Sequence, residues 1–575
     1  FTEYQWKADL PGEPWDTGFS ELNEPDPVVQ QGGQHLGVIG SAARNLFGPF
    51  KSSIFTWTGL TATEPWITRP ENVKYYRTNK RLTRLDYHMG SFREQSIEAF
   101  HSQNIIRNWN AGLRFRRFNV KDFLPRSDPY YNRFLFFTDY ESQDGRYHIF
   151  ANAMWNSLRN QLNGGITYDT IFSGKETSNI DLKGLPVNLS TAENRTKEKS
   201  FEISHYYRID RPSDSSRISS RFFLNSVYSA GSSTYSDNEP DSSAVYEYFY
   251  DGLSSYDSLG FQDFRNKSGL DFSLRTKKSL LRISPFAEHQ LYTYFQDTTI
   301  SQKNFSVGAE ASIDISRFRF KAVRQVMLGR ENDGNNSTTF SIGFQSGNWT
   351  ISGSLTDKKS VVPLIFQYFK SNHLRWSNRF DPIENSLLSL SFQHRKSGLS
   401  VDIESESIKG FLFMDRDAVP EQHDGTLVIR RMSVRKDFSY KKWHMENRIR
   451  LQQISDESIL RLPALHLVHS VYWENDLLNK AFILTAGIRF RYQSSYYADA
   501  FMPASNTFYL QDSISCAGQP IFDLFTDMRI KGATIYLSAN NILQGIASNA
   551  FYMTPFYPQA GMTYRFGVRW FFLDQ

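Results

Sequence analysis

Hydrophobic and polar residues alternate with a period of two in many segments of the chain. In residues 305–315, apolar side chains take every odd position and polar or small ones every even position. Residues 482–492 and 563–572 repeat the pattern, and residues 443–452 repeat it with Asn447 as an exception. Successive side chains of a strand point to opposite faces, so each segment predicts a strand with one apolar face. A tilted strand of about ten residues also crosses a bilayer.

Turn-forming residues separate these segments in two ways. Short turns are predicted at residues 143–145, 346–348, 395–398 and 531–532. Long loops rich in Ser, Asn and Asp are predicted at residues 173–199, 229–265 and 497–517. Short turns on one side and long loops on the other are typical of outer-membrane barrels. We therefore predict an all-β fold, a large antiparallel transmembrane β-barrel of about 20 strands (range about 16–22).

Residues 1–70 differ from the rest of the chain. This stretch contains Pro11, Pro14, Pro25, Pro27, Pro49 and the pair Gly32 and Gly33, and it sustains no period of 2 or 3.6. Proline and glycine interrupt regular elements. We predict an irregular N-terminal segment at 1–70, lying in the periplasm or in the lumen, followed by an outer-membrane β-barrel at 71–575.

Composition narrows the class of protein. Only 40% of residues are hydrophobic, and no apolar run approaches the roughly 18 residues of a membrane helix. Aromatic residues make up 15%, which argues against disorder. The 65 basic and 60 acidic side chains interleave, so no nucleic-acid partner is indicated. The alternative is a soluble all-β sugar-binding protein or enzyme, which would purify without detergent.

Several short motifs, in order along the chain, resemble the putative porin family of the Bacteroidota. The most extended are YYADAFMP at 496–503 and YRFGVRW at 564–570. Others lie at residues 85–91, 101–104, 163–166, 460–466, 471–473, 508–511, 521–525 and 538–541. The resemblance covers most of residues 70–575. It implies a multi-pass β-barrel in the bacterial outer membrane, and it implies no defined substrate.

Charged residues occupy the polar faces of the predicted strands. The acidic candidates for the lumen wall are Asp402, Glu404 and Glu406. The basic candidates are Arg448, Arg450, Arg489, Arg491, Arg529, Lys531, Arg565 and Arg569. Facing lipid, each Arg would cost roughly 2–4 kcal/mol at the bilayer midplane, which places them inside. Two interpretations stay open: a transverse field that orients solutes in a water-filled lumen, or an ion-pair network that fills a closed one.

The final strand carries an aromatic pattern. Phe566, Val568, Trp570 and Phe572 share one face and resemble the signal read by the outer-membrane insertion machinery; the alternative is a core strand of a soluble protein. His466 and His469 would lie on opposite faces of a strand. No nucleotide-binding or hydrolase motif occurs, so we predict no enzymatic activity, no metal site and no cofactor.

Two functions follow from this reading. In the first, the barrel is a porin that allows passive diffusion of small polar solutes. In the second, the lumen is plugged and the barrel is a structural subunit of a larger outer-membrane secretion or assembly complex. Expected partners are outer-membrane lipids and lipopolysaccharide, the insertion machinery during biogenesis and, in the second case, other subunits of that complex.

Overall fold

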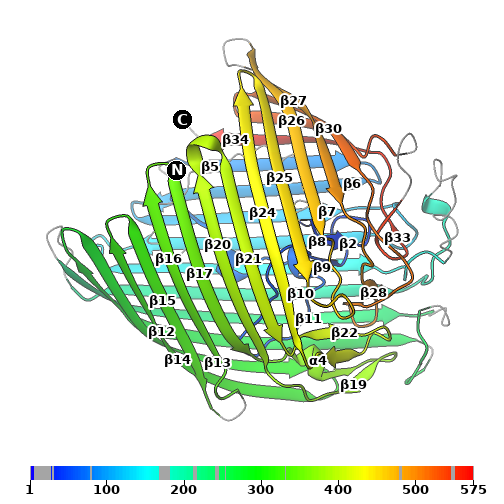
Figure 1. The fold of residues 1–575 in the computed structure, drawn as a ribbon, viewed down its shortest axis with the longest axis horizontal. Helices are drawn as coiled ribbons and strands as arrows, with labels where there is room; N and C mark the ends of the chain where they lie inside the picture. Colours follow the sequence, from blue (N-terminus) through cyan, green and yellow to red (C-terminus); the bar gives the residue numbers. More distant parts are fainter. Residues whose placement is uncertain are drawn as a thin grey trace.

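A closed antiparallel β-barrel of 22 strands makes up most of the chain (Figure 1). The computed structural model describes residues 2–4, 28, 32–77, 80–167, 182–210, 217–239, 245–252, 254–329, 332–477, 482–544 and 551–573. Strands follow one another around the wall in sequence order, and β34 closes the barrel by pairing with β5. The all-β barrel prediction is confirmed, with a strand number at the top of the expected range.

The barrel strands have the following bounds. They are β5 (Leu82–Gly90), β6 (Glu94–Ile106), β7 (Trp109–Asn119), β8 (Pro129–Glu141), β9 (Tyr147–Gln161), β10 (Glu193–Arg208), β11 (Ile218–Asp237), β12 (Ser255–Arg275), β13 (Ser279–Phe295), β14 (Thr299–Ile315), β15 (Phe318–Leu328), β16 (Asn336–Ser346), β17 (Trp349–Ser360), β20 (Ile383–His394), β21 (Leu399–Lys409), β24 (Thr426–Tyr440), β25 (Trp443–Ile454), β26 (Leu465–Leu477), β27 (Phe482–Gln493), β30 (Ile521–Ile530), β31 (Ala533–Asn540) and β34 (Thr563–Leu573).

Short elements lie outside the wall. They are β1 (Thr2–Tyr4), β2 (Gln34–His35), β3 (Ala43–Arg44), η1 (Glu64–Trp66), η2 (Pro70–Asn72), β4 (Tyr75–Arg77), η3 (Leu182–Gly184), α4 (Leu364–Gln367), β18 (Tyr368–Lys370), β19 (Arg375–Ser377), η4 (Arg395–Ser397), β22 (Leu412–Met414), β23 (Pro420–Gln422), β28 (Ala500–Met502), β29 (Thr507–Tyr509), β32 (Tyr552–Thr554) and β33 (Tyr557–Pro558). No helix among the described residues is long and apolar enough to cross a membrane.

The period of two in the sequence separates the two faces of the wall. On β14, Phe305, Val307 and Ile315 are exposed on the outer face, whereas Ser306 is fully buried on the inner face. The same division holds on β27, where Ile488 is exposed and Arg489 is buried. Every backbone group of a closed barrel can bond to a neighbouring strand, so the apolar outer side chains meet lipid without unpaired edges.

Two of the three predicted loops are partly barrel strands, and the third, 497–517, contains the short strands β28 and β29. Residues 193–199 belong to β10, and both ends of 229–265 belong to β11 and β12. Near the C-terminal end of β11, Ser229 and Ser233 are buried on the inner face, whereas Ser232 and Thr234 lie on the outer face. β11 and β12 have 20 and 21 residues, about twice the roughly ten that cross a bilayer. Their ends therefore extend beyond the lipid, and most side chains on both faces of these ends are small or polar. The alternation that marks a strand is therefore absent from these extensions.

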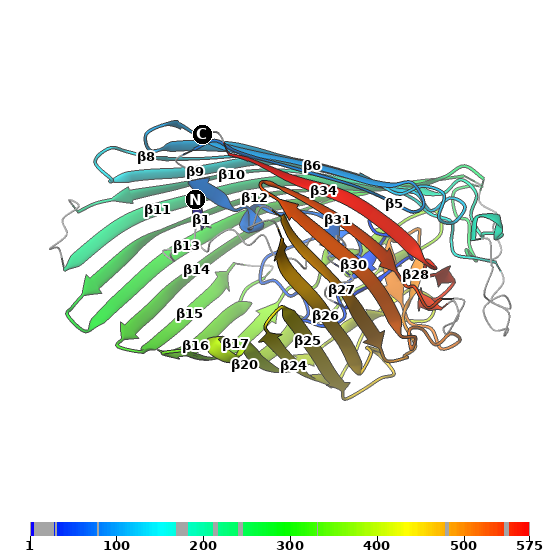
Figure 2. The same ribbon diagram turned by 90° about the horizontal axis from the view of Figure 1, so that it is seen from above.

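The four predicted short turns and the long loops lie at opposite ends of the barrel, and two further short connections, 91–93 and 296–298, lie at the long-loop end. The predicted turns at 143–145, 346–348, 395–398 and 531–532 each join two consecutive strands. The C-terminal end of β34 and the start of β5 lie at this short-turn end, since Leu573 is opposite Leu82. Both chain ends therefore lie on the same side of the barrel, close together in both views (Figures 1 and 2).

Six glycines of the wall lie directly opposite an aromatic ring that a Cβ on the glycine would approach within 3 Å. The pairs are Gly112 with Phe137, Gly231 with Phe261, Gly269 with Phe223, Gly308 with Phe286, Gly487 with Phe525 and Gly567 with Tyr536. A Cβ on Gly567 would come within 2.1 Å of Tyr536 Cζ. The ring thus covers backbone that the glycine leaves bare, as in aromatic rescue of strand glycines.

Candidate functional site in the barrel lumen

Apart from Lys531, the predicted basic residues of the last strands lie on the inner face of the wall, and three of them pair with carboxylates of nearby strands. The pairs are Arg491 with Asp523 at 2.9 Å, Arg565 with Glu94 at 3.0 Å, and Arg569 with Asp86. Arg569 and Asp86 are direct cross-strand partners. The partner of Arg565, Glu94, lies on β6, one strand beyond β5. These charges therefore interact along the wall, between adjacent strands or across one strand.

The other basic candidates differ in their surroundings. Arg489 is buried, with its guanidinium 5.6 Å from the centre of the Phe525 ring. Arg450 is half-buried beside Arg448, and its guanidinium lies 5.9 Å from the ring of Phe47. Arg529 is exposed near the short-turn end of β30.

Lys531 does not line the lumen wall. It lies in the turn between β30 and β31, is exposed, and has a φ of 51°. A two-residue turn needs left-handed backbone to reverse the chain, and this takes the Lys531 side chain away from the regular in-and-out alternation of the strands.

The acidic candidates occupy consecutive inner positions of β21. Ile403 between them is exposed on the outer face. Glu406 is fully buried and accepts hydrogen bonds from Arg431 Nη1 at 2.8 Å and Asn385 Nδ2 at 2.8 Å. Arg431 also lies 3.7 Å from Glu404. Arg431 thus forms ion pairs with two of the three acidic candidates, Glu404 and Glu406.

A second charged cluster lies on β5–β8, and the sequence reasoning missed it. The buried Glu98 carboxylate lies 2.7 Å from Arg114 and 3.9 Å from both Arg116 and Arg133, and it also pairs with Arg84. The signal was present, because Arg84 with Asp86 and Arg114 with Arg116 repeat at a spacing of two. This spacing was not recognised because the alternation of apolar and polar residues is shorter in these strands than in β14 or β27.

Residues 32–77, which we call the lumen segment, lie inside the barrel and contact its wall on several sides (Figure 2). Residues 1, 5–27 and 29–31 of the predicted irregular segment lie outside the described residues. Only β2–β4 and two short 3-10 turns occur in the lumen segment. It therefore depends on the wall for most of its backbone order.

One side of the wall holds the second half of the lumen segment. Asn156 Nδ2 donates to the Thr68 carbonyl at 3.1 Å, and Arg133 donates to the Thr68 hydroxyl. Tyr75 is fully buried and its hydroxyl accepts from Asn152 Nδ2 at 2.9 Å. These partners lie on β8 and β9.

The wall further around the barrel, on β13, β14 and β21, holds the middle of the lumen segment. Gln290 on β13 bonds to both backbone groups of Thr56, accepting from its N–H at 3.1 Å and donating to its carbonyl at 2.9 Å. Asn304 on β14 donates to the Thr56 hydroxyl at 2.9 Å. Glu406 accepts from the Phe50 N–H at 3.1 Å. The acidic candidate Glu406 is thus covered by the lumen segment.

The long-loop end holds the first part of the lumen segment. Arg44 Nη1 donates to the Asp499 carboxylate at 2.6 Å, and Gln34 Nε2 donates to the Asp499 carbonyl at 2.9 Å. Burial, together with the nearby Arg491 and Arg565, lowers the pKa of His35 to about 4. The imidazole is therefore neutral at physiological pH.

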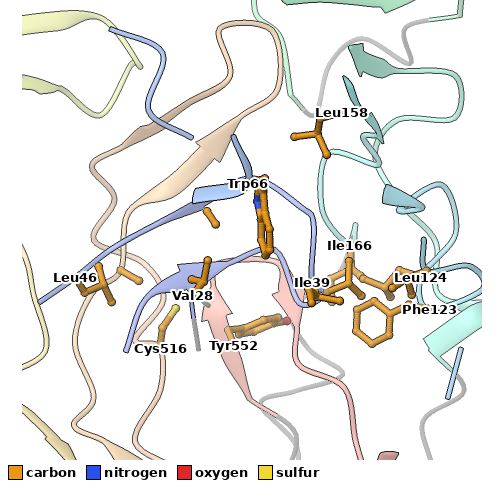
Figure 3. Close-up of a cluster of buried hydrophobic side chains, with 14 of the residues drawn as sticks. Val28, Ile39, Leu46, Trp66, Phe123, Leu124, Leu158, Ile166, Cys516 and Tyr552 are labelled. Carbon is orange, nitrogen blue, oxygen red and sulfur yellow. The ribbon is translucent and has the colours of Figure 1, made fainter. Parts of the chain in front are cut away.

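The long loops share hydrophobic cores with the lumen segment. Figure 3 shows one of them, to which the lumen segment contributes Ile39, Leu46 and Trp66, and the loops Phe123, Leu124, Ile166, Cys516 and Tyr552. A second core joins Leu36, Ala42 and Ala62 to Phe501 and Tyr557. Loop and segment are thus packed as one body at this end of the barrel.

The sequence model of the putative porin family matches residues 4–574. The chain belongs to the putative porin family. The match includes the lumen segment as well as the barrel, so both are parts of the family's sequence. No curated protein matches the chain.

Solved structures similar to this porin-family chain include the FrpB iron transporter from Neisseria meningitidis (TM-score 0.60, 11% identity, 86% of this chain and 83% of that chain). Others are the copper transporter OprC (TM-score 0.64, 10% identity, 86% and 81%) and BauA, the ferric preacinetobactin receptor from Acinetobacter baumannii (TM-score 0.59, 11% identity, 87% and 81%). At these identities the likeness shows a shared fold. This fold is an outer-membrane-type β-barrel.

The C-terminal candidates of this porin-family barrel lie on the outer face of β34. Phe566, Trp570 and Phe572 are exposed, and Val568 on the same face is half-buried. Their placement is that of lipid-facing residues. Recognition by insertion machinery stays a prediction.

Proposed function

We propose that this chain is a bacterial outer-membrane barrel whose lumen is closed at rest by residues 32–77. Small polar solutes would pass when this segment is displaced. The observation that carries the proposal is the set of hydrogen bonds from Thr56, Thr68 and Phe50 to inner residues on opposite parts of the wall. A segment bound to opposite parts of the wall crosses the lumen and occupies its cross-section.

Two further points support a transport role. The family is described as putative porins. Proteins that share the fold include transporters of iron and copper. A barrel of this strand number is wide enough to conduct once its lumen is cleared, and barrels of similar width are known with plugged lumens.

A second candidate function is a permanently closed barrel that serves as a structural subunit of an outer-membrane complex. The shared cores of loops and lumen segment favour it, because Trp66 and Leu46 would have to leave apolar surroundings for the lumen to open. Burying such side chains contributes roughly 1.5–3 kcal/mol each. In the first function the lumen segment can leave the lumen, and in the second it cannot.

Conductance in a planar lipid bilayer tests the proposal. We expect the intact chain to be silent and the chain lacking residues 1–70 to give steady open steps. A chain lacking only residues 2–27 is the matched control, and it should stay silent because the lumen segment remains. Steady large steps from the intact chain would refute closure, and silence of the 1–70 deletion would favour the structural subunit.

The same proposal also implies which molecules surround the barrel. The apolar outer face would contact lipids and lipopolysaccharide, and the insertion machinery would read β34 during assembly. We propose no enzymatic activity and no nucleic-acid partner.

A further inference from the structure

A cavity of about 160 Å³ lies between the lumen segment and the wall. His35 and Gly32 line it from the lumen segment, His466 and Gln493 line it from β26 and β27, and Gln559 lines it from the loop before β34. A Cβ on Gly32 would come within 3.0 Å of His466 Nδ1. The Gly32 backbone therefore packs closely against the His466 ring, and the cavity lies beside this contact.

Five buried polar atoms of the lining have no hydrogen-bond partner among the described residues. They are His35 Nδ1, His466 Nδ1, Gln493 Nε2, Asn541 Oδ1 and Gln559 Nε2. Four of these side chains are more than nine-tenths buried, namely His35, His466, Gln493 and Asn541. A buried polar group without a partner costs about 1–3 kcal/mol. Their gathering around one cavity points to an occupant that bonds to them.

The hydrogen-bond donors of the lining favour an occupant with several acceptor oxygens. Two guanidinium groups border the cavity: Arg491, which pairs with Asp523, and Arg565, which pairs with Glu94. The two amide nitrogens are donors only, whereas Asn541 Oδ1 is the single unpartnered amide acceptor. Burial is the main reason that the pKa of His35 is lowered, and the same arginines add to it. The part of the shift that comes from the arginines would favour an anion.

We propose that this cavity binds one small oxyanion, of the size of inorganic phosphate or a short carboxylate. Amide nitrogens of Gln493 and Gln559 donate to its oxygens, and the guanidinium groups of Arg491 and Arg565 border it. Because lumen segment and wall both line the site, the occupant links the two. The inference concerns binding to the closed protein and does not require that the barrel conduct.

Ordered water is the competing occupant. A cavity of this size holds on the order of ten water molecules by volume, and water also bonds to mixed donors and acceptors. The two occupants differ in one property: water binding does not depend on the concentration of an added anion.

Equilibrium dialysis of the intact detergent-solubilised chain with radiolabelled inorganic phosphate distinguishes them. We expect one phosphate bound per chain, displaced by acetate and not by the neutral solute glycerol. Gln493→Leu should weaken phosphate binding at least about tenfold, since a hydrogen bond to a charged group is worth about 1.5–3 kcal/mol. Leucine fills a similar volume and removes an unpartnered donor, so the variant should still fold.

Gln325→Leu is the matched control. Gln325 lies on β15, where its amide donates to Glu288 at 3.0 Å and Ser306 at 2.9 Å, away from the cavity. Phosphate binding should not change in this variant. If Gln493→Leu misassembles, Gln559→Leu makes the same test. No saturable binding, equal loss in both variants, or displacement by glycerol as effective as by acetate would each overturn the proposal.

Discussion

The buried carboxylate of Glu406 is expected to fix the lumen segment to the wall, and Glu406→Gln tests this. The variant keeps the shape of the side chain and removes its charge. Arg431, itself buried, then keeps only Glu404 at 3.7 Å, a partner that is partly exposed. The amide oxygen can accept two hydrogen bonds and the amide nitrogen accepts none, so the glutamine cannot serve all three donors, Asn385, Arg431 and the Phe50 N–H.

The magnitude follows from the partners left behind. Removing one member of a buried ion pair costs about 3–5 kcal/mol, because the other charge stays buried. The residual contact with Glu404 reduces this, so we expect a loss of about 3 kcal/mol. Replacing both partners, as Glu406→Gln with Arg431→Gln, should cost less than the sum of the single variants.

Urea unfolding in phospholipid vesicles gives the free energy of unfolding for each variant. Asp402→Asn is the matched control on the same strand and face, since a hydrogen bond from Ser400 at 3.3 Å is its one side-chain contact among the described residues. It should change stability by less than about 0.5 kcal/mol. Equal effects of Glu406→Gln and Asp402→Asn would refute the reasoning.

Three further predictions test other features. Gly567→Ala should destabilise the barrel by about 1–3 kcal/mol through overlap with Tyr536, whereas Gly343→Ala, whose Cβ would have 3.8 Å of clearance, should be tolerated; urea unfolding measures both, and equal effects would argue against the ring contact. Since the folded-state pKa of His35 is about 4, below its unfolded value, stability should fall as pH drops from about 6.5 towards 4, by about 2 kcal/mol at pH 5. His35→Gln should lack this part of the pH dependence, and an unchanged dependence in that variant would contradict it. Leu390→Arg on the lipid face should cost roughly 2–4 kcal/mol in vesicle unfolding, and a neutral result would mean that this face does not meet lipid.

The wall could be predicted from sequence where the two faces of a strand meet different surroundings. β14 and β27 cross lipid with apolar residues outside and polar residues inside, so period two is visible. The ends of β11 and β12 lost that signal because neither face meets lipid there.

The interior could not be predicted in the same way. Contacts such as Thr56 with Gln290 or Arg44 with Asp499 join residues hundreds of positions apart, and no local period encodes them. Inward orientation of Arg565 and Arg569 followed from alternation, but their pairing with Glu94 and Asp86 required knowledge that β34 closes on β5. Closure is a property of the whole barrel, and local patterns carry no information about it.

The order of its contacts along the chain determines how the lumen segment responds to mechanical force. The segment begins at the long-loop end, where Gln34 bonds to Asp499, and ends near the short turns, where Arg77 bonds to Asp139. Tension applied to the start of the segment would reach the contacts one after another, first at Gln34, then at Phe50 and Thr56. Contacts loaded in series break individually, each at about 0.5–1.5 kcal/mol for a hydrogen bond. A segment that is strongly bound at equilibrium can therefore be peeled out by a small force acting over a long distance.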